Sequence, residues 1–76
     1  MNETERAKAL ISDEFFKGVV EKQRQMYIAM ILNSADDDVD GRERSLLKLR
    51  ALEEFIASIE SSAKSGEIRE KRFKVF

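Results

Sequence analysis

The spacing of apolar residues predicts two long amphipathic helices. The first runs from Asp13 to Asn33, and its apolar residues share one broad face at 3.6 residues per turn: Phe15, Phe16, Val19, Val20, Met26, Tyr27, Met30 and Ile31. The second runs from about Asp38 to Ser65. Its apolar seam alternates steps of four and three, as in a coiled coil, and consists of Ser45, Leu49, Leu52, Ile56, Ile59 and Ala63.

A short helix is expected before these two. Asn2 can cap it, and Glu5 follows three residues later, as in a capping box. This helix is expected to carry residues 6–11, and Ser12 is expected to be the N-cap of the next helix. The acidic side chains that follow Ser12 then lie in a first turn, where the helix dipole favours negative charge.

The segment between the two long helices, residues 33–41, is short and acidic. Two long helices joined by a short loop form an antiparallel hairpin, and Gly66 is the type of residue that follows a last helical turn. We therefore expect an all-α fold, with a short N-terminal helix and an antiparallel two-helix hairpin in residues 1–66 and a basic, apolar tail in residues 67–76. Because so short a chain buries little core, oligomerisation is expected to complete it.

The composition narrows the chemistry. The 76 residues include no Pro, His, Cys or Trp, and the net charge is -1. Disulfide scaffolds, Cys/His zinc sites and Cys or His nucleophiles are thereby excluded, and bulk attraction to nucleic acid or to an anionic membrane is not favoured. The longest apolar run, residues 26–32, is too short to cross a bilayer. With a polar, acidic N-terminal segment, this predicts a cytoplasmic protein.

The predicted loop carries one motif that suits a metal ion. Asp36, Asp38, Asp40 and Gly41 match positions one, three, five and six of a calcium-binding helix–loop–helix motif. Leu47, however, occupies the twelfth position, where that motif has a bidentate Glu. The alternative is that these Asp side chains cap the following helix and interact with its dipole. Calcium and helix capping both remain open at this point.

Partner contacts are expected along both long helices. Gln23 lies within the apolar face of the first, where a buried polar residue can set the register of an interface; the alternative is an edge position that bonds to water. The aromatic and Met residues of this face could line a binding groove or could be core. The candidate partner-binding residues of the helices are Phe16, Val20, Gln23, Tyr27, Leu49, Leu52, Ile56 and Ile59.

The last residues alternate basic and apolar side chains. Phe73 and Phe76 could enter a pocket of a protein partner, and together with the neighbouring Lys and Arg they form a small basic and aromatic patch. The net charge of residues 66–76 is only +2, so a docking tail or a solvated end is favoured over a nucleic-acid site.

Two stretches of the sequence resemble a known group of proteins. The first consists of Arg6-Ala7-Lys8-Ala9-Leu10-Ile11-Ser12-Asp13-Glu14-Phe15-Phe16 and, after the long helix and the acidic turn, Gly41-Arg42-Glu43-Arg44. The second is Leu49-Arg50-Ala51-Leu52-Glu53-Glu54-Phe55. Residues 6–66 resemble small helical-hairpin accessory proteins encoded in the packaging and head gene clusters of tailed bacteriophages. The resemblance implies a role in virion assembly or structure, located in the host cytoplasm or the virion, and implies no catalytic residues.

The sequence thus favours a non-enzymatic structural or assembly accessory protein that binds itself or a larger protein assembly through helix–helix contacts. The alternative is a small regulatory adaptor or inhibitor that binds its partner through the C-terminal tail; a calcium-responsive hairpin is a further alternative. No cofactor and no small-molecule substrate are expected, because Gly18, Gly41 and Gly66 are isolated and form no phosphate-binding loop.

Overall fold

The chain forms three α-helices. They are α1 (Glu3–Ser12), α2 (Glu14–Leu32) and α3 (Val39–Val75). The structure, a computed structural model, describes the backbone of residues 2–75 and the side chains of residues 2–64. Over that backbone it contains helices and connecting turns but no strand, so the predicted all-α fold class is confirmed.

Side-chain caps mark where α1 and α2 begin. The Glu5 N–H donates to Asn2 Oδ1 over 2.8 Å, which confirms the predicted cap of α1. The prediction that Ser12 caps the next helix is wrong, since Ser12 is the last residue of α1. Asp13 has an extended backbone and accepts from the Phe16 N–H over 3.0 Å, so it separates α1 from α2. Because Asp and Ser are equally good N-caps, the sequence did not distinguish these adjacent positions.

The third helix begins where the sequence places it and ends much later. Asp38 Oδ1 accepts from the Gly41 N–H over 3.0 Å and caps α3. The helix then continues through Gly66 to Val75, so the predicted end at Ser65 is wrong. A helical Gly costs only about 1 kcal/mol relative to Ala, and Gly66 is followed by the strong helix formers Glu, Arg and Lys. The division into residues 1–66 and 67–76 as separate units remains a prediction.

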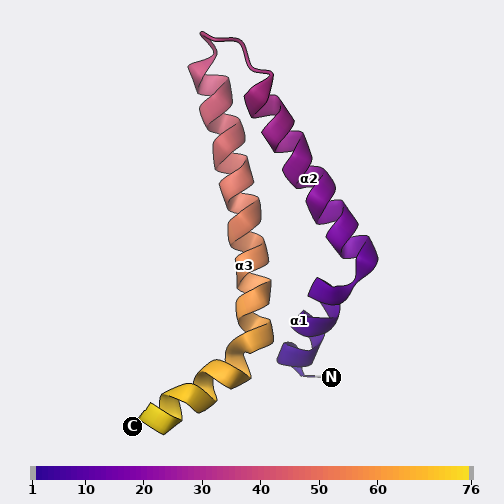
Figure 1. Ribbon diagram of the computed structural model, residues 1–76, viewed down its shortest axis with the longest axis vertical. Helices are drawn as coiled ribbons and strands as arrows, with labels where there is room; N and C mark the ends of the chain where they lie inside the picture. Colours follow the sequence, from indigo (N-terminus) through magenta and orange to yellow (C-terminus); the bar gives the residue numbers. More distant parts are fainter. Residues whose placement is uncertain (1, 76) are drawn as a thin grey trace.

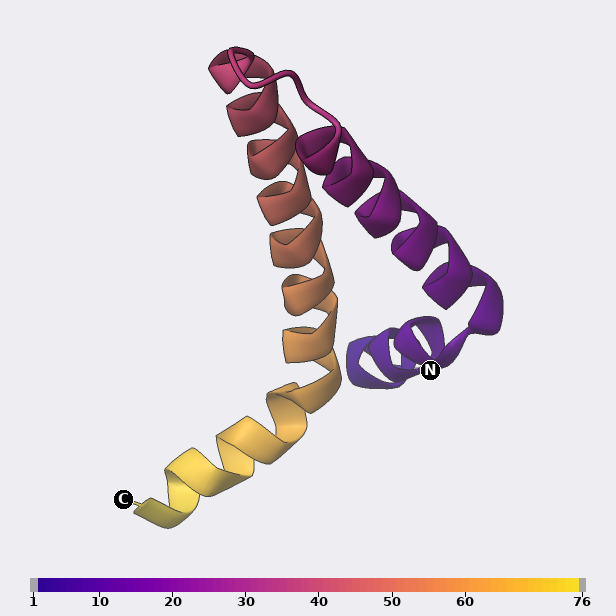
Figure 2. The ribbon, with the colours of Figure 1, turned by 45° about the horizontal axis from the view of Figure 1, so that its top comes forward.

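The helices form one layer rather than a globule. Figure 1 shows α2 and α3 leaving their connecting loop side by side and separating toward the other end. There α1 turns back from the start of α2 and packs against α3 (Figure 2). The molecule measures 53 × 32 × 13 Å. Its smallest dimension is far below the other two, as expected for helices that lie side by side.

A layer one helix thick encloses little interior. Among the described side chains, Ala7, Ser45 and Ala63 are the buried ones, and all three are small. The radius of gyration is 16.9 Å, whereas a compact chain of this length has about 11 Å. The accessible surface is 6290 Å², and a compact monomer of this mass exposes about 4,800 Å². The chain therefore leaves about 1,500 Å² more surface in water than its mass requires.

Candidate interaction surface

The apolar residues that face inward belong to the chain's own packing. All six predicted seam positions of α3 are buried or half-buried, among them Leu49, Leu52, Ile56 and Ile59. Phe16, Val20 and Tyr27 of α2 are also half-buried. Seven of the predicted partner-binding residues thus line the inner faces of α2 and α3. Whether they also bind a partner remains a prediction.

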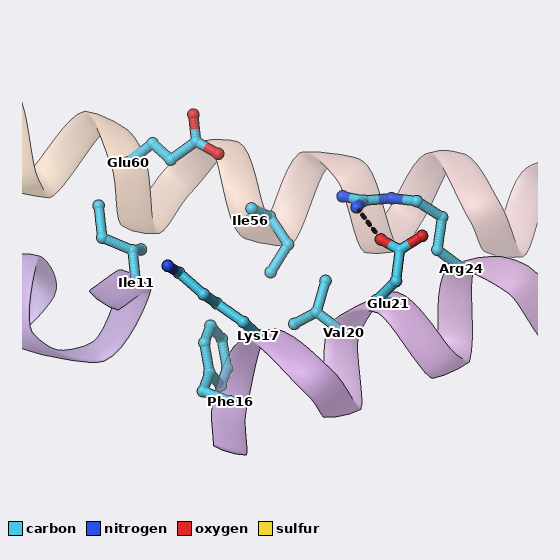
Figure 3. A pocket seen from close by; sticks show the side chains of 8 residues that line it. All are labelled: Ile11, Phe16, Lys17, Val20, Glu21, Arg24, Ile56 and Glu60. Atoms are coloured by element: carbon cyan, nitrogen blue, oxygen red, sulfur yellow. Dashed lines mark hydrogen bonds and ion pairs between the residues drawn. The ribbon is translucent and has the colours of Figure 1, made fainter. Parts of the chain in front are cut away.

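A hollow opens between the three helices where α2 and α3 separate (Figure 3). Ile11 of α1, Phe16 and Val20 of α2 and Ile56 of α3 form its apolar part. Lys17 extends into the opening in Figure 3, and the remaining lining residues, Glu21, Arg24 and Glu60, are charged. With a volume of about 260 Å³ and an open mouth, this hollow marks incomplete packing between α1, α2 and α3.

Charged side chains join α2 to α3 beside this hollow. Arg24 Nε donates to Glu53 Oε1 over 2.6 Å, and Arg24 Nη1 donates to Glu21 Oε2 over 2.9 Å. Gln25 Nε2 donates to Glu21 Oε1 over 2.9 Å. The hydrogen bond from Gln25, followed by that from Arg24, lowers the pKa of Glu21, and the bonds to Glu53 and Glu21 raise the pKa of Arg24. This side of the layer is therefore polar.

The opposite side of α2 carries an exposed apolar strip. Phe15, Val19, Met26 and Met30 follow one another in steps of four, seven and four residues, which places them within about 60° of one another around the helix. Phe15 is 80% exposed, and the other three are between 42% and 47% exposed. The broad face that the sequence predicts for this helix is thus divided: one half packs against α3, and this half faces water.

Phe55 of α3 lies on the same side of the layer as this strip. Met30 lines a shallow groove together with Arg44 and Lys48 of α3, which fixes the side of α3 that adjoins the strip. Phe55 follows Lys48 by seven residues, or two helical turns, and so occupies that side. It lies almost opposite Glu53 around the helix, and it is 57% exposed. We call Phe15, Val19, Met26, Met30 and Phe55 the outer apolar face.

The sequence placed Phe15, Val19, Met26 and Met30 on one apolar face and left open whether its aromatic and Met residues line a binding groove or form core. It did not name Val19 or Phe55 as contact residues. The periodicity of apolar residues identifies a wide apolar face of a helix, but it cannot tell which half of that face packs inward and which half remains in water. Gln23, which was named, is exposed at the edge of the outer apolar face. Leu46 and Leu47 are also exposed, but they lie on other sides of α3.

Hydrogen bonds from Asp38 and Arg42 hold the acidic loop between α2 and α3. Asp38 caps α3, and Arg42 donates to Ser34 Oγ over 3.1 Å, to the Ala35 carbonyl over 2.9 Å and to the Asp36 carbonyl over 3.2 Å. Within the described residues the structure gathers no group of three carboxylates that could hold a metal ion, so it does not bring Asp36, Asp38 and Asp40 together in that way. The guanidinium of Arg42 instead joins the two ends of the loop.

Two predicted contact residues, Phe73 and Phe76, lie outside the described side chains. The described part of the chain also contains no helix long and apolar enough to span a bilayer. In comparisons with known proteins, no family model, no curated protein and no solved structure matches this chain.

Proposed function

We propose that this chain is a non-enzymatic structural or assembly protein that acts through helix–helix contacts. In this proposal α2 and α3 form a helical hairpin, and another helical surface covers what the single layer leaves in water. The observation that carries the proposal is the outer apolar face, together with the finding that the buried side chains among residues 2–64 are all small. Contiguous apolar patches of several hundred Å² on small proteins mark interaction sites.

The energetics favour association over a free monomer. Burying a large apolar side chain contributes about 1.5–3 kcal/mol, and the large apolar side chains that the structure describes are half-buried at best. Ten large hydrophobic side chains are at least 40% exposed in the part of the chain with described side chains. A chain without disulfides has few other ways to gain this stability than a second helical surface.

The biological context that we propose for this function rests on the sequence alone. The resemblance of residues 6–66 to phage head and packaging accessory proteins supports an assembly role in the host cytoplasm or the virion. The adaptor alternative depends on the tail, and no described side chain bears on it.

The test is the absolute mass in solution, measured by light scattering behind a sizing column over a wide concentration range, together with thermal unfolding. A stable oligomer supports the proposal. A monomer at every concentration that unfolds in one sharp, concentration-independent transition, and that binds no dye specific for apolar surface, contradicts it, because the chain would then need no cover.

The inner seam provides a second readout. Ile56→Asp places a carboxylate at a half-buried position between α2 and α3 and should abolish folding and association together. A folded Ile56→Asp variant that associates like the wild type would show that the seam is not needed for the contact. Ala57→Asp, at an exposed position of the same helix, is the matched control and should change neither property.

A further inference from the structure

The four residues of the α2 strip are spaced symmetrically along the helix. Phe15 and Met30 are equally far from the midpoint between Lys22 and Gln23, and so are Val19 and Met26. An antiparallel copy of α2 laid on this strip with its midpoint at the same place therefore sets Phe15 against Met30 and Val19 against Met26. Each pair then occurs twice, which is the pattern of a two-fold interface.

From this spacing we propose that the outer apolar face binds a second copy of this chain in a two-fold antiparallel dimer. The inference rests on the proposed function and names its partner. The two-fold axis passes beside Lys22 and Gln23, and Phe15 of each copy packs against Met30 of the other. A methionine sulfur beside an aromatic ring is a favourable contact.

The same axis brings the two copies of α3 together. The Arg24–Glu53 ion pair sets the level of α3 against α2, so Phe55, two residues after Glu53, lies near the level of the axis. Because α3 lies on the same side of α2 in both copies, α3 stacks on α3, and Phe55 meets Phe55 of the second copy. The product is a two-layered bundle of four long helices, in which helices of adjacent layers lie about 8–10 Å apart.

The polar residues at the edges of the interface are also compatible with the two-fold axis. Gln23 lies on the flank of α2 nearer to α3, so the two Gln23 amides meet close to the axis. An amide both donates and accepts, so it can hydrogen-bond to its own copy. Lys22 lies on the other flank and meets Lys22 of the second copy at the solvent-exposed rim. The dimer therefore brings like charges together at Lys22, and Arg44 and Lys48 of α3 add positive charge on the same side of each copy. Dissolved salt screens this repulsion.

The exposed apolar area supplies a large part of what a stable dimer needs. A side chain of this size exposes about 200 Å² when fully in water, so the five residues of the outer apolar face leave on the order of 500 Å² exposed. With its polar edges, such a face approaches the roughly 800 Å² that each partner buries in a standard interface.

Cysteine cross-linking tests the register, since the chain has no cysteine of its own. Under mild oxidation Gln23→Cys should form a disulfide-linked dimer. Val19→Cys alone should not, because two copies of residue 19 lie about 10 Å apart along an antiparallel pair, beyond disulfide reach. Mixing Val19→Cys with Met26→Cys should restore cross-linking. Efficient self-linkage of Val19→Cys, or linkage of Glu60→Cys on the other side of the layer instead of Gln23→Cys, would overturn the arrangement.

A matched pair of charge substitutions tests the surface. Met30→Lys and Leu46→Lys both alter residues that are 47% exposed, so neither should unfold the chain. Met30→Lys should raise the dimer dissociation constant by roughly 100-fold or more, because it removes the same contact twice. Leu46→Lys, on another side of α3, should leave it unchanged. Circular dichroism confirms that both variants remain helical.

Salt dependence is a third readout with a distinctive sign. Raising the salt concentration, or substituting Lys22→Gln, should tighten the dimer because each weakens the Lys22 contact. Association in which Met30→Lys has no effect overturns this interface but leaves the proposed assembly function standing. A wild-type monomer that binds anionic lipid vesicles through Met30 makes a membrane the occupant and overturns both.

Discussion

Arg24 Nε lies 2.6 Å from Glu53 Oε1, and this ion pair joins α2 to α3 on the polar side of the layer. The Arg24 side chain is 31% exposed and that of Glu53 is 49% exposed, so water screens their attraction. The same guanidinium binds Glu21 on its own helix. Arg24 therefore fixes the relative position of the two long helices more than it stabilises them.

The first prediction concerns the strength of this ion pair. In a double-mutant cycle with Arg24→Gln and Glu53→Gln, the coupling free energy should be about 0.2–1 kcal/mol, as for other exposed ion pairs. Urea unfolding of the four proteins measures it. A coupling above about 3 kcal/mol would mean that the pair is buried in the folded assembly, in disagreement with its exposure here.

The second prediction concerns acid. The pKa of Glu21 is lowered in the folded chain, so its ionised form stabilises the fold at pH values above the unfolded pKa, about 4.3, and this contribution is lost as pH falls through the folded pKa. The melting temperatures of wild type and Glu21→Gln should therefore differ at pH 7 and converge once the pH has fallen below the folded pKa. Because the Glu21 side chain is 55% exposed, we expect a small difference. A gap that widens in acid would contradict the sign.

The third prediction compares two helical glycines. A Cβ added at Gly18 meets no atom within 4 Å, so Gly18→Ala should stabilise the fold by about 0.5–1 kcal/mol through helix propensity. A Cβ at Gly41 would lie 2.7 Å from Asp38 Cγ and displace the carboxylate that caps α3. Gly41→Ala should therefore gain nothing. Thermal melts at one protein concentration measure both, and equal stabilisation by both variants would show that the Asp38 cap contributes little.

The fourth prediction concerns the loop. Arg42 makes its three hydrogen bonds with a planar fork that a Lys ammonium cannot reproduce. Arg42→Lys should therefore destabilise the chain by about 1–2 kcal/mol and speed amide hydrogen exchange in the first turn of α3. Arg44→Lys, at an exposed position one half-turn later, is the control and should do neither. Unchanged exchange in Arg42→Lys would show that the acidic loop holds its shape without the guanidinium.

The fifth prediction concerns the small buried residues. Ala63 is 3% exposed on α3, so Ala63→Leu should destabilise the fold by about 1–3 kcal/mol, because the added atoms force the helices apart. Ala57→Leu adds the same atoms at an exposed position and should be nearly neutral. Urea unfolding separates the two. If Ala63→Leu proved stabilising, the added side chain would have to fill unoccupied space between the helices.

The sequence predicted the elements well where one physical signal dominates. The alternating steps of four and three from Ser45 to Ala63 identified the buried face of α3, because residues at this spacing all lie along one side of a helix. The cap at Asn2 followed from one side chain and one N–H. Gly66 misled because its local preference for a helix end is weaker than the combined helix propensity of its neighbours.

The candidate surface was harder to predict because it depends on relative positions. Phe15 and Phe16 are adjacent apolar residues of one type, yet Phe16 lines the hollow and Phe15 is 80% exposed. The two residues differ in exposure because of the way α2 is oriented against α3. The spacing of apolar residues within α2 does not predict that orientation. Arg24 likewise carried no sequence signal, since its partner Glu53 is 29 residues away.

A layer only 13 Å thick also has a thermodynamic consequence. With so little interior, a single chain is expected to unfold with low cooperativity, and in the proposed assembly the covering helical surface adds the rest. If that cover is another copy, the melting temperature rises with protein concentration, since mass action favours the associated and folded state. The free energy of unfolding then depends on protein concentration, and dilution alone is enough to unfold the chain.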